Sequence, residues 1–201
     1  MLTPCLRSGV VEAGCDEAGR GCLAGPVFAA AVVLPPDFRN DELNDSKQLT
    51  DTQRRRLRTL IEHDALACAV ALASAQEIDS LNILRASILA MHRAIDALTL
   101  RPEHLLIDGN RFSPYPGIPH TTVVKGDSTY MAIAAASVLA KTYRDDYMIA
   151  LHADFPAYDW AHNKGYPTPK HCAALLEYGP TPHHRRTFHV PGCDRQLSFD
   201  F

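Results

Sequence analysis

The residue types best suited to chemistry lie in one short stretch near the start of the chain, residues 14–26. The adjacent carboxylates Asp16 and Glu17 are followed directly by the turn Gly19-Arg20-Gly21. Glycine lets a ligand approach the backbone closely, and the planar guanidinium of arginine suits a phosphate. Carboxylates would repel a phosphate at this turn unless a divalent cation lay between them. Because Mg²⁺ and Mn²⁺ prefer carboxylate oxygens, the stretch predicts a metal-dependent phosphate site.

Two common phosphate-binding motifs do not explain this stretch. Its glycine spacing departs from the dinucleotide-binding pattern, which must also open a helix. Residues 27–34 are instead apolar, partly β-branched and closed by Pro35-Pro36, so they predict a strand. No Gly-Lys-Ser/Thr sequence follows, which excludes a P-loop. An isolated Asp-Glu pair is more often part of a solvated surface turn, so the metal hypothesis depends on further acids.

The composition limits the class of protein. The 201 residues predict one domain, and no apolar run is long enough to span a bilayer, so we expect a cytoplasmic protein. A net charge of -3 argues against a generic basic nucleic-acid binder, although acids at a metal site would lower the total without facing phosphates. Residues 54–58 and 183–186 form basic clusters, which we interpret as a solvated helix face and a solvated tail. The six cysteines show no Cys-x-x-Cys pairing, so we expect free thiols.

Hydrophobic periodicity and turn residues predict the order of strands and helices. Apolar or β-branched runs predict strands at residues 10–15, 27–34, 66–73, 104–107 and 121–124. Helices are expected from the Thr50-x-x-Gln53 capping box to about 63, over 83–98, from a cap at Ser128 or its neighbours to 150, and over 169–178. This order predicts an α/β domain with a mixed sheet and helices on both faces. Its topology should begin with an antiparallel hairpin and continue through right-handed β-α-β crossovers.

Three of the predicted strands end in acids, at Asp16-Glu17, Asp108 and Asp127. Functional residues of α/β sheets collect where strands end and loops begin. For Asp127 alone, a role in a cap or turn is the more common one. Four acids that converge on one edge cannot all ionise comfortably without a cation. With cations they form the all-oxygen site of two-metal phosphodiester hydrolysis.

Taken together, the motifs resemble bacterial ribonuclease HII over residues 11–188, nearly the whole chain. The segments that carry the resemblance are 16–21 (Asp-Glu-Ala-Gly-Arg-Gly), 44–47 (Asn-Asp-Ser-Lys), 108–110 (Asp-Gly-Asn), 125–127 (Lys-Gly-Asp), 137–141 (Ser-Val-Leu-Ala-Lys), 165–168 (Gly-Tyr-Pro-Thr) and 183–186 (His-His-Arg-Arg). Each segment is moderately specific, and their shared order and spacing make the set highly specific.

The resemblance implies an RNase H-like fold over residues 1–190, with a small C-terminal helical segment from about residue 168 and a flexible tail over 191–201. It implies a monomeric endonuclease that uses two Mn²⁺ or Mg²⁺ ions to hydrolyse the RNA strand of RNA–DNA hybrids. It also implies nicking of duplex DNA on the 5′ side of an embedded ribonucleotide. The products would carry a 3′-hydroxyl and a 5′-phosphate, and the reaction would serve DNA repair.

The resemblance also assigns roles to single residues. The family's catalytic and metal-binding carboxylates correspond to Asp16, Glu17, Asp108 and Asp127. Its Gly-Arg-Gly element, which reads the ribose 2′-OH and flanking phosphates, corresponds to Gly19, Arg20 and Gly21, and its substrate-facing tyrosine to Tyr166. As candidates for phosphate contacts we take Lys47, Lys141, Lys164 and Arg185. His183 and His184 rank lower as acid–base groups, because a metal site activates water without them.

The expected partners are RNA–DNA hybrids and ribonucleotide-containing duplex DNA, without a membrane. Residues 196–201, Gln-Leu-Ser-Phe-Asp-Phe, resemble peptides that dock on replication sliding clamps; the alternative is that both phenylalanines fold back onto the domain. Two other functions stay open. Another metal-dependent nuclease of this fold would share the acids but lack a reason for the Gly-Arg-Gly turn and Tyr166. A non-catalytic hybrid-binding module would tolerate the loss of an acid.

Overall fold

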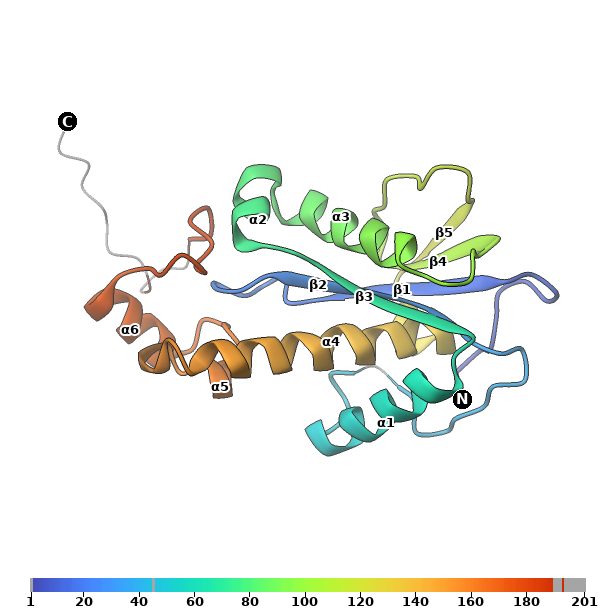
Figure 1. The fold of residues 1–201 in the computed structure, drawn as a ribbon, viewed down its shortest axis with the longest axis horizontal. Helices are drawn as coiled ribbons and strands as arrows, with labels where there is room; N and C mark the ends of the chain where they lie inside the picture. Colours follow the sequence, from blue (N-terminus) through green and yellow to red (C-terminus); the bar gives the residue numbers. More distant parts are fainter. Residues whose placement is uncertain (1, 45, 190–192, 194–201) are drawn as a thin grey trace.

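The structure is a computed structural model that describes residues 2–44, 46–189 and 193. A five-stranded sheet lies at its centre, in the order β3-β2-β1-β4-β5 (Figure 1). The strands are β1 (Glu12–Ala18), β2 (Val27–Val33), β3 (Ala67–Ala73), β4 (His104–Asp108) and β5 (His120–Val123). The pairs β1–β2 and β2–β3 are antiparallel, whereas β1–β4 and β4–β5 are parallel. The sheet is therefore mixed and begins with the predicted hairpin.

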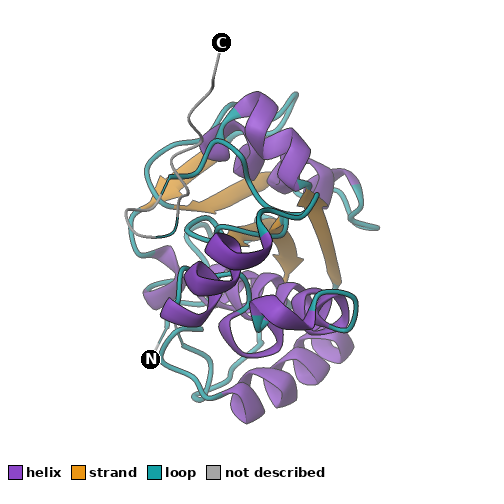
Figure 2. Ribbon diagram, turned by 90° about the vertical axis from the view of Figure 1, so that its left-hand side faces the viewer, coloured by secondary structure: helices purple, strands orange, loops and turns teal. Residues whose placement is uncertain are grey.

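Helices cover both faces of the sheet, as Figure 2 shows from the side. They are α1 (Asp51–Asp64), α2 (Ala75–Leu81), α3 (Ile83–Asp96), α4 (Met131–His152), α5 (Trp160–Asn163) and α6 (Pro169–Tyr178). Helices α2 and α3 lie on one face, and the long helix α4 packs on the other with α1 outside it. The short helices α5 and α6 follow the C-terminal end of α4 (Figure 1). This arrangement confirms the expected α/β class.

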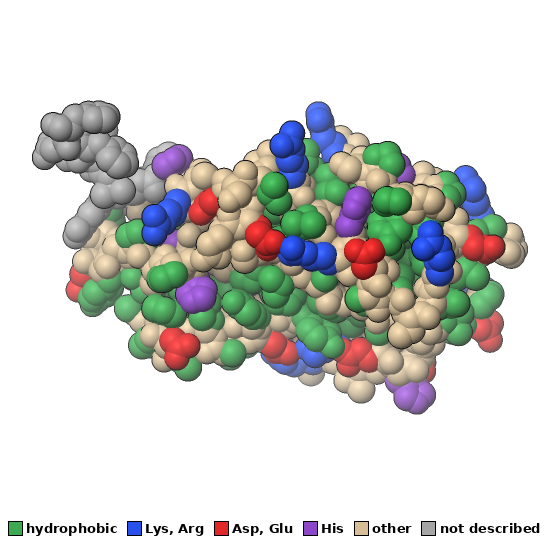
Figure 3. Space-filling model, turned by 45° about the horizontal axis from the view of Figure 1, so that its top comes forward, with side chains coloured by type: hydrophobic (Ala, Val, Ile, Leu, Met, Phe, Trp, Pro, Cys, Tyr) green, Lys and Arg blue, Asp and Glu red, His purple; other side chains and the backbone are tan. Residues whose placement is uncertain are grey.

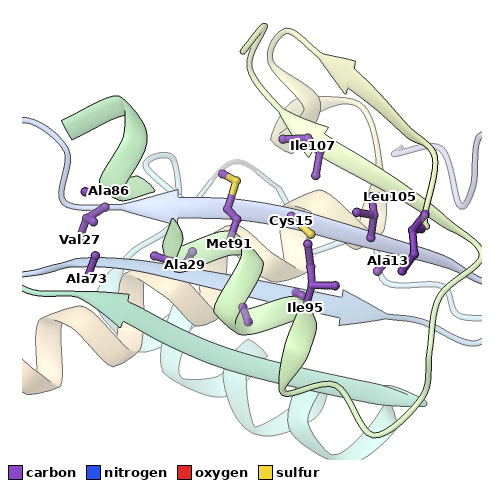
Figure 4. Close-up of a cluster of buried hydrophobic side chains, with 14 of the residues drawn as sticks. Ala13, Cys15, Val27, Ala29, Ala73, Ala86, Met91, Ile95, Leu105 and Ile107 are labelled. Atoms are coloured by element: carbon purple, nitrogen blue, oxygen red, sulfur yellow. The ribbon is translucent and has the colours of Figure 1, made fainter. Parts of the chain in front are cut away.

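Alternation of side chains along β1 decides which residues face which helix. Ala13 and Cys15 belong to the core under α3, where Figure 4 shows them together with Met91. Gly14 and Asp16 therefore face α4 on the opposite side of the sheet. The first acid of the candidate site is thus directed toward α4 by strand geometry.

The contact between β1 and α4 depends on small residues. A Cβ added at Gly14 would overlap the backbone of Ala132, so only glycine allows this approach. The first ten residues of α4 are all buried, as its run of small and apolar residues predicts. This close packing fixes the position of α4 relative to the strand that carries the acids.

Two boundaries differ from the prediction and both affect the site. Strand β1 continues to Ala18, paired with Phe28 of β2, so Asp16 and Glu17 lie inside the strand and not after it. The predicted cap at Ser128 or its neighbours is wrong, because the N-cap residue Tyr130 makes no side-chain cap hydrogen bond. Residues 126–128 form a 3₁₀ turn before α4 instead.

Further differences concern short helices. The helix α2 was not expected, although Ser74 and Glu77 form a capping box that sequence analysis could have recognised. The capping box of Thr50 and Gln53 and the cap of α6 by Thr168 are confirmed. Helix α5 has only four residues and no periodic pattern to reveal it.

The C-terminal segment departs most from the prediction. His184 and Arg185 are 5% and 2% exposed, so the interpretation of residues 183–186 as a solvated tail is wrong for them. A disulfide joins Cys172 and Cys193, whose Cα atoms are 4.3 Å apart, so the prediction of free thiols is wrong for this pair. The burial of His184 and Arg185 and the disulfide both depend on contacts between segments that are distant in sequence. Residue spacing therefore does not reveal them. Of the predicted tail over 191–201, only Cys193 is among the described residues.

The surface carries charges of both signs. On the face shown in Figure 3, basic and acidic side chains are interspersed. The basic cluster of α1 is paired within the protein, because Arg55 and Arg58 both donate to Asp146 of α4. Because charges of both signs are mixed on this face, any contact with nucleic acid there must depend on a local arrangement of charge.

Within the described ranges, no helix is long and apolar enough to cross a bilayer.

Candidate active site

The predicted acids come from neighbouring elements at one edge of the sheet. Cys15 of β1 pairs with Ile107 of the parallel strand β4, so Asp16 and Asp108 follow at equivalent positions. Asp127 lies in the 3₁₀ turn after β5, the strand beside β4. Parallel strands bring their carboxyl ends to the same edge, where ligands of α/β proteins bind. The fold therefore gathers acids that are more than a hundred residues apart in sequence.

A backbone hydrogen bond ties Asp108 to the turn that carries Asp127. Asp108 Oδ1 accepts a hydrogen bond of 2.7 Å from the N–H of Gly126. Lys125 enters the turn with a left-handed φ of 56°, and a side chain at Gly126 would press on Ile133. The turn thus has little freedom, and Asp127 in it is 5% exposed.

Asp16 has polar neighbours in both its own strand and α4. Its Oδ1 accepts a hydrogen bond of 2.7 Å from the N–H of Glu17. The Ser137 hydroxyl of α4 lies near Asp16 and acts to lower its pKa, and the Ser137 oxygen lies 2.8 Å from Oγ of Ser46. Ser46 and Ser137 had no expected role in their motifs; in the structure, Ser137 is a polar neighbour of Asp16.

The pKa values of Asp16 and Glu17 are both raised in this site. Burial raises the pKa of Asp16 well above its usual range, and the charges of Glu17 and Asp108 raise it further. Burial also raises the pKa of Glu17, while the Arg20 guanidinium acts in the opposite direction. Buried carboxylates that repel one another gain most from a nearby cation. The oxygen-only donor set is the one that hard divalent cations prefer.

Basic side chains of the protein lie beside two of these acids. Arg20 Nη1 is 2.9 Å from Glu17 Oε1, and Lys47 Nζ is 3.6 Å from Asp127 Oδ2. In the part of the chain that the structure describes, no three His, Cys, Asp or Glu side chains are arranged as a preassembled metal site. Glu17 and Asp127 therefore face cationic groups of the protein, whereas Asp16 and Asp108 accept hydrogen bonds from backbone N–H groups.

The Gly-Arg-Gly turn lies directly beside Tyr166. Gly19 has a left-handed φ of 95°, and a Cβ there would overlap the guanidinium of Arg144. A Cβ added at Gly21 would lie 3.9 Å from Cε1 of Tyr166. Tyr166 is 41% exposed and lies in a loop between α5 and α6. The fold thus brings the turn and the tyrosine together.

Two buried arginines bind the backbone of the Gly-Arg-Gly turn and of the segments next to it. Arg185 donates to the carbonyl oxygens of Gly19, Arg20 and Gly25 at 2.7, 2.8 and 2.9 Å. Arg144 donates to the carbonyl oxygens of Ala24, Pro26 and Lys164 at 3.1, 3.0 and 2.8 Å. Burial, together with the smaller effect of the Arg144 charge, lowers the pKa of Arg185 to about 10. The two guanidinium groups therefore join the turn to the Tyr166 loop and the C-terminal segment.

Sequence analysis missed Arg144 and assigned Arg185 to phosphate. A signal for Arg144 existed, since it follows the buried Ala140 and precedes the buried Met148 at helical spacing. Arg185 is 2% exposed, so its guanidinium faces the backbone of the turn and not solvent.

The remaining candidates have different environments. Lys141 is bonded to Asp145 at 2.5 Å, and the amine of Lys164 donates to the carbonyl of Ala161. Burial lowers the pKa of His184 to about 3, which leaves the ring neutral, and its nitrogens bond His171 and Thr181. Of the lysines proposed for phosphate, Lys47 has an 80% exposed side chain beside an acid of the site.

Arg185→Lys should reduce the free energy of unfolding by about 2–4 kcal/mol, because one ammonium cannot replace a fork that serves three carbonyl oxygens. Urea denaturation measures this change. The matched control is Arg186→Lys at the exposed neighbouring position, where we expect a change within about 0.5 kcal/mol. Equal losses at both positions would contradict the structural role of Arg185.

Comparison with known proteins places these features in a family. The sequence model described as Ribonuclease HII matches residues 13–191. A curated relative of that name from Bacteroides thetaiotaomicron is 66% identical over 201 residues, which is 100% of both chains. The crystal structure of ribonuclease H2 from Pyrococcus horikoshii OT3 has a TM-score of 0.75 and 26% identity, covering 88% of this chain and 93% of that one.

A second solved structure supports the fold alone. It is the PCNA:RNase HII complex from Archaeoglobus fulgidus, with a TM-score of 0.75, 24% identity and coverage of 95% of this chain and 99% of that one. These neighbours confirm the expected RNase H-like fold. The match over nearly the whole chain shows that it belongs to the ribonuclease HII family and has ribonuclease H activity.

Proposed function

We propose that this enzyme hydrolyses the RNA strand of RNA–DNA hybrids and nicks duplex DNA on the 5′ side of an embedded ribonucleotide. The products carry a 3′-hydroxyl and a 5′-phosphate. One observation carries the proposal: an edge of acids lies next to a glycine turn whose Arg20 and Gly21 are exposed, with a tyrosine beside it. The acids supply a phosphodiester-hydrolysing site, and the turn with Tyr166 supplies a reason for choosing a ribonucleotide.

Asp16, Glu17, Asp108 and Asp127 are the residues that would hold the divalent cations, Mn²⁺ or Mg²⁺. Such ions activate water and stabilise the charge on the leaving oxygen during in-line phosphodiester hydrolysis. The protein contributes the position of the acids: the Glu17 N–H orients Asp16 beside Ser137, and the Gly126 N–H orients Asp108. Arg20 and Lys47 add positive charge for the substrate phosphates beside the same acids.

Peptide geometry explains how the turn would read a 2′-OH. A trans peptide directs its C=O and the following N–H to opposite sides. Arg185 binds the carbonyl oxygens of Gly19 and Arg20, so the N–H groups of Arg20 and Gly21 face away from it. Because glycine leaves no Cβ in the way, a sugar can approach these N–H groups. The 2′-OH is the group that distinguishes one ribonucleotide from its DNA neighbours.

The enzyme's setting follows from this reaction. We propose a monomeric, cytoplasmic enzyme that acts in the removal of ribonucleotides from DNA. The chain's relatives and fold support the nuclease activity, and the glycine turn beside Tyr166 supports the proposed substrate class.

The first test uses a labelled DNA duplex that holds one ribonucleotide, beside an all-DNA duplex of the same sequence. We expect a nick just 5′ of the ribonucleotide with Mn²⁺ or Mg²⁺, none with chelator, and an intact control. Equal cutting of both duplexes would indicate a general metal-dependent nuclease. Tight binding without cutting in either metal would indicate a non-catalytic binding module.

Asp16→Asn should lower turnover by at least about 10²-fold, the loss typical when a group that stabilises transition-state charge is removed. Asparagine keeps the shape of the side chain and removes its charge, so substrate binding should survive. Turnover and fluorescence anisotropy with the same duplex separate these two effects. Asp37→Asn in an exposed loop is the matched control. Turnover near that of the unmodified enzyme would refute the role of Asp16.

A further proposal concerns a partner. Residues 196–201, outside the described ranges, resemble clamp-docking peptides, and the Archaeoglobus fulgidus protein was solved as a complex with PCNA. We expect the full chain to capture its sliding clamp in a pull-down, and a chain ending at Arg195 to lose this capture. Equal recovery by both chains would exclude docking through these residues.

A further inference from the structure

The backbone of the exposed Tyr166 is bound by a buried histidine side chain. Its carbonyl oxygen accepts one hydrogen bond of 2.8 Å from the N–H of Thr168, inside the loop. A second, of 2.9 Å, links the same oxygen to Nδ1 of His171 in α6. His171 is 0% exposed, although it reaches a residue whose ring faces solvent. A buried side chain therefore fixes the backbone of the residue proposed to contact the substrate.

The partners of His171 determine which of its nitrogens carries the proton. The indole N–H of Trp160 only donates, and it lies 3.1 Å from Nε2 of His171. Nε2 must therefore accept, and the proton sits on Nδ1, where it donates to the carbonyl of Tyr166. Burial lowers the pKa of His171, which keeps the ring neutral.

His184 completes this hydrogen-bonded chain. Its Nδ1 accepts a hydrogen bond of 2.9 Å from the N–H of Thr181. Its Nε2 therefore carries the proton and donates to Nε2 of His171 over 3.0 Å. Both donors to His171, from Trp160 and His184, favour the same tautomer. The chain of hydrogen bonds runs from the C-terminal segment through α6 to the Tyr166 loop.

The phenol of Tyr166 lies near the buried thiol of Cys22, directly after the Gly-Arg-Gly turn, and each group contributes to the pKa shift of the other. A Cβ added at Gly21 would lie 3.9 Å from the Tyr166 ring. Because a side chain follows its own backbone, a shift of the Tyr166 backbone would move the ring relative to Gly21.

We propose that His171 is a positioning residue for substrate recognition: its Nδ1–H fixes the carbonyl of Tyr166 and so the ring beside the Gly-Arg-Gly turn, in a tautomer set by Trp160 and His184. This inference rests on the proposed role of Tyr166 at the ribonucleotide. It gives the buried His171 and His184 a part in recognition. This part differs from the acid–base role that the sequence raised for His183 and His184.

Two substitutions at His171 separate positioning from packing. The amide nitrogen of Asn lies where Nδ1 of histidine lies, so His171→Asn keeps a donor for Tyr166 and loses the contacts to Trp160 and His184. The longer His171→Gln places its amide near the Nε2 position, so it keeps those contacts and loses the donor for Tyr166. Both variants remove a ring and bury an amide, which makes them matched controls for each other.

We expect kcat/KM on the duplex with one ribonucleotide to be at least tenfold lower for His171→Gln than for His171→Asn. Urea denaturation should give similar stabilities for the two variants. Emission from Trp160, the single tryptophan of the chain, reports whether the cluster around it stays packed. Equal activities, or a lower activity for His171→Asn, would overturn the proposal.

A double-substitution cycle with Tyr166→Ala links the effect to the tyrosine. If His171 acts through Tyr166, His171→Gln should lower kcat/KM less than threefold in the Tyr166→Ala background. Normal activity of Tyr166→Ala alone would refute the proposed role of Tyr166. An impaired Tyr166→Ala with a further tenfold loss from His171→Gln would refute the positioning role and leave the proposed function standing.

If neither variant at His171 folds, His184→Asn carries the test. It leaves His171 in place, keeps an acceptor for the N–H of Thr181 and removes the donor to Nε2 of His171. We expect kcat/KM to fall at least threefold, and this loss to disappear in the Tyr166→Ala background. A loss of equal size in both backgrounds, or none, would overturn the proposal.

Discussion

Two buried guanidinium groups hold together the parts of this molecule that would meet a substrate. Arg144 and Arg185 each donate to three backbone carbonyl oxygens, and these oxygens belong to the Gly-Arg-Gly turn, the segment after it and the loop before Tyr166. Loops carry unpaired backbone groups that must find partners when they are buried. Arginine meets this need with five donors in a rigid fork, which one lysine could not supply.

The need to pair buried backbone groups also explains why the C-terminal segment, residues 183–185, packs next to the Gly-Arg-Gly turn. Residues 183–185 form backbone hydrogen bonds with Leu23 and Gly25, beside the turn. Tyr158, Trp160 and the histidines His171 and His184 pack together behind them. The segment interpreted from the sequence as a basic tail thus packs against the residues that follow the Gly-Arg-Gly turn.

Repulsion among acids is the second constraint on the site. Asp16, Glu17 and Asp108 lie close enough to raise the pKa values of Asp16 and Glu17, and nearby positive charge relieves this repulsion. Arg20 and Lys47 supply part of it within the protein. A site with this charge pattern suits an anionic substrate that arrives together with divalent cations.

The sequence by itself determined the strands, the main helices and the identity of the acids, because period, capping boxes and strand-end carboxylates are local features. It also brought Tyr166 and the glycine turn into one hypothesis through the family resemblance. Only the tertiary structure decided that Arg185 and His184 are buried, that Arg144 supports the turn and that Cys172 meets Cys193. These facts depend on which distant segments pack together, and a charged or polar residue has the same local pattern whether it later faces solvent or a backbone carbonyl.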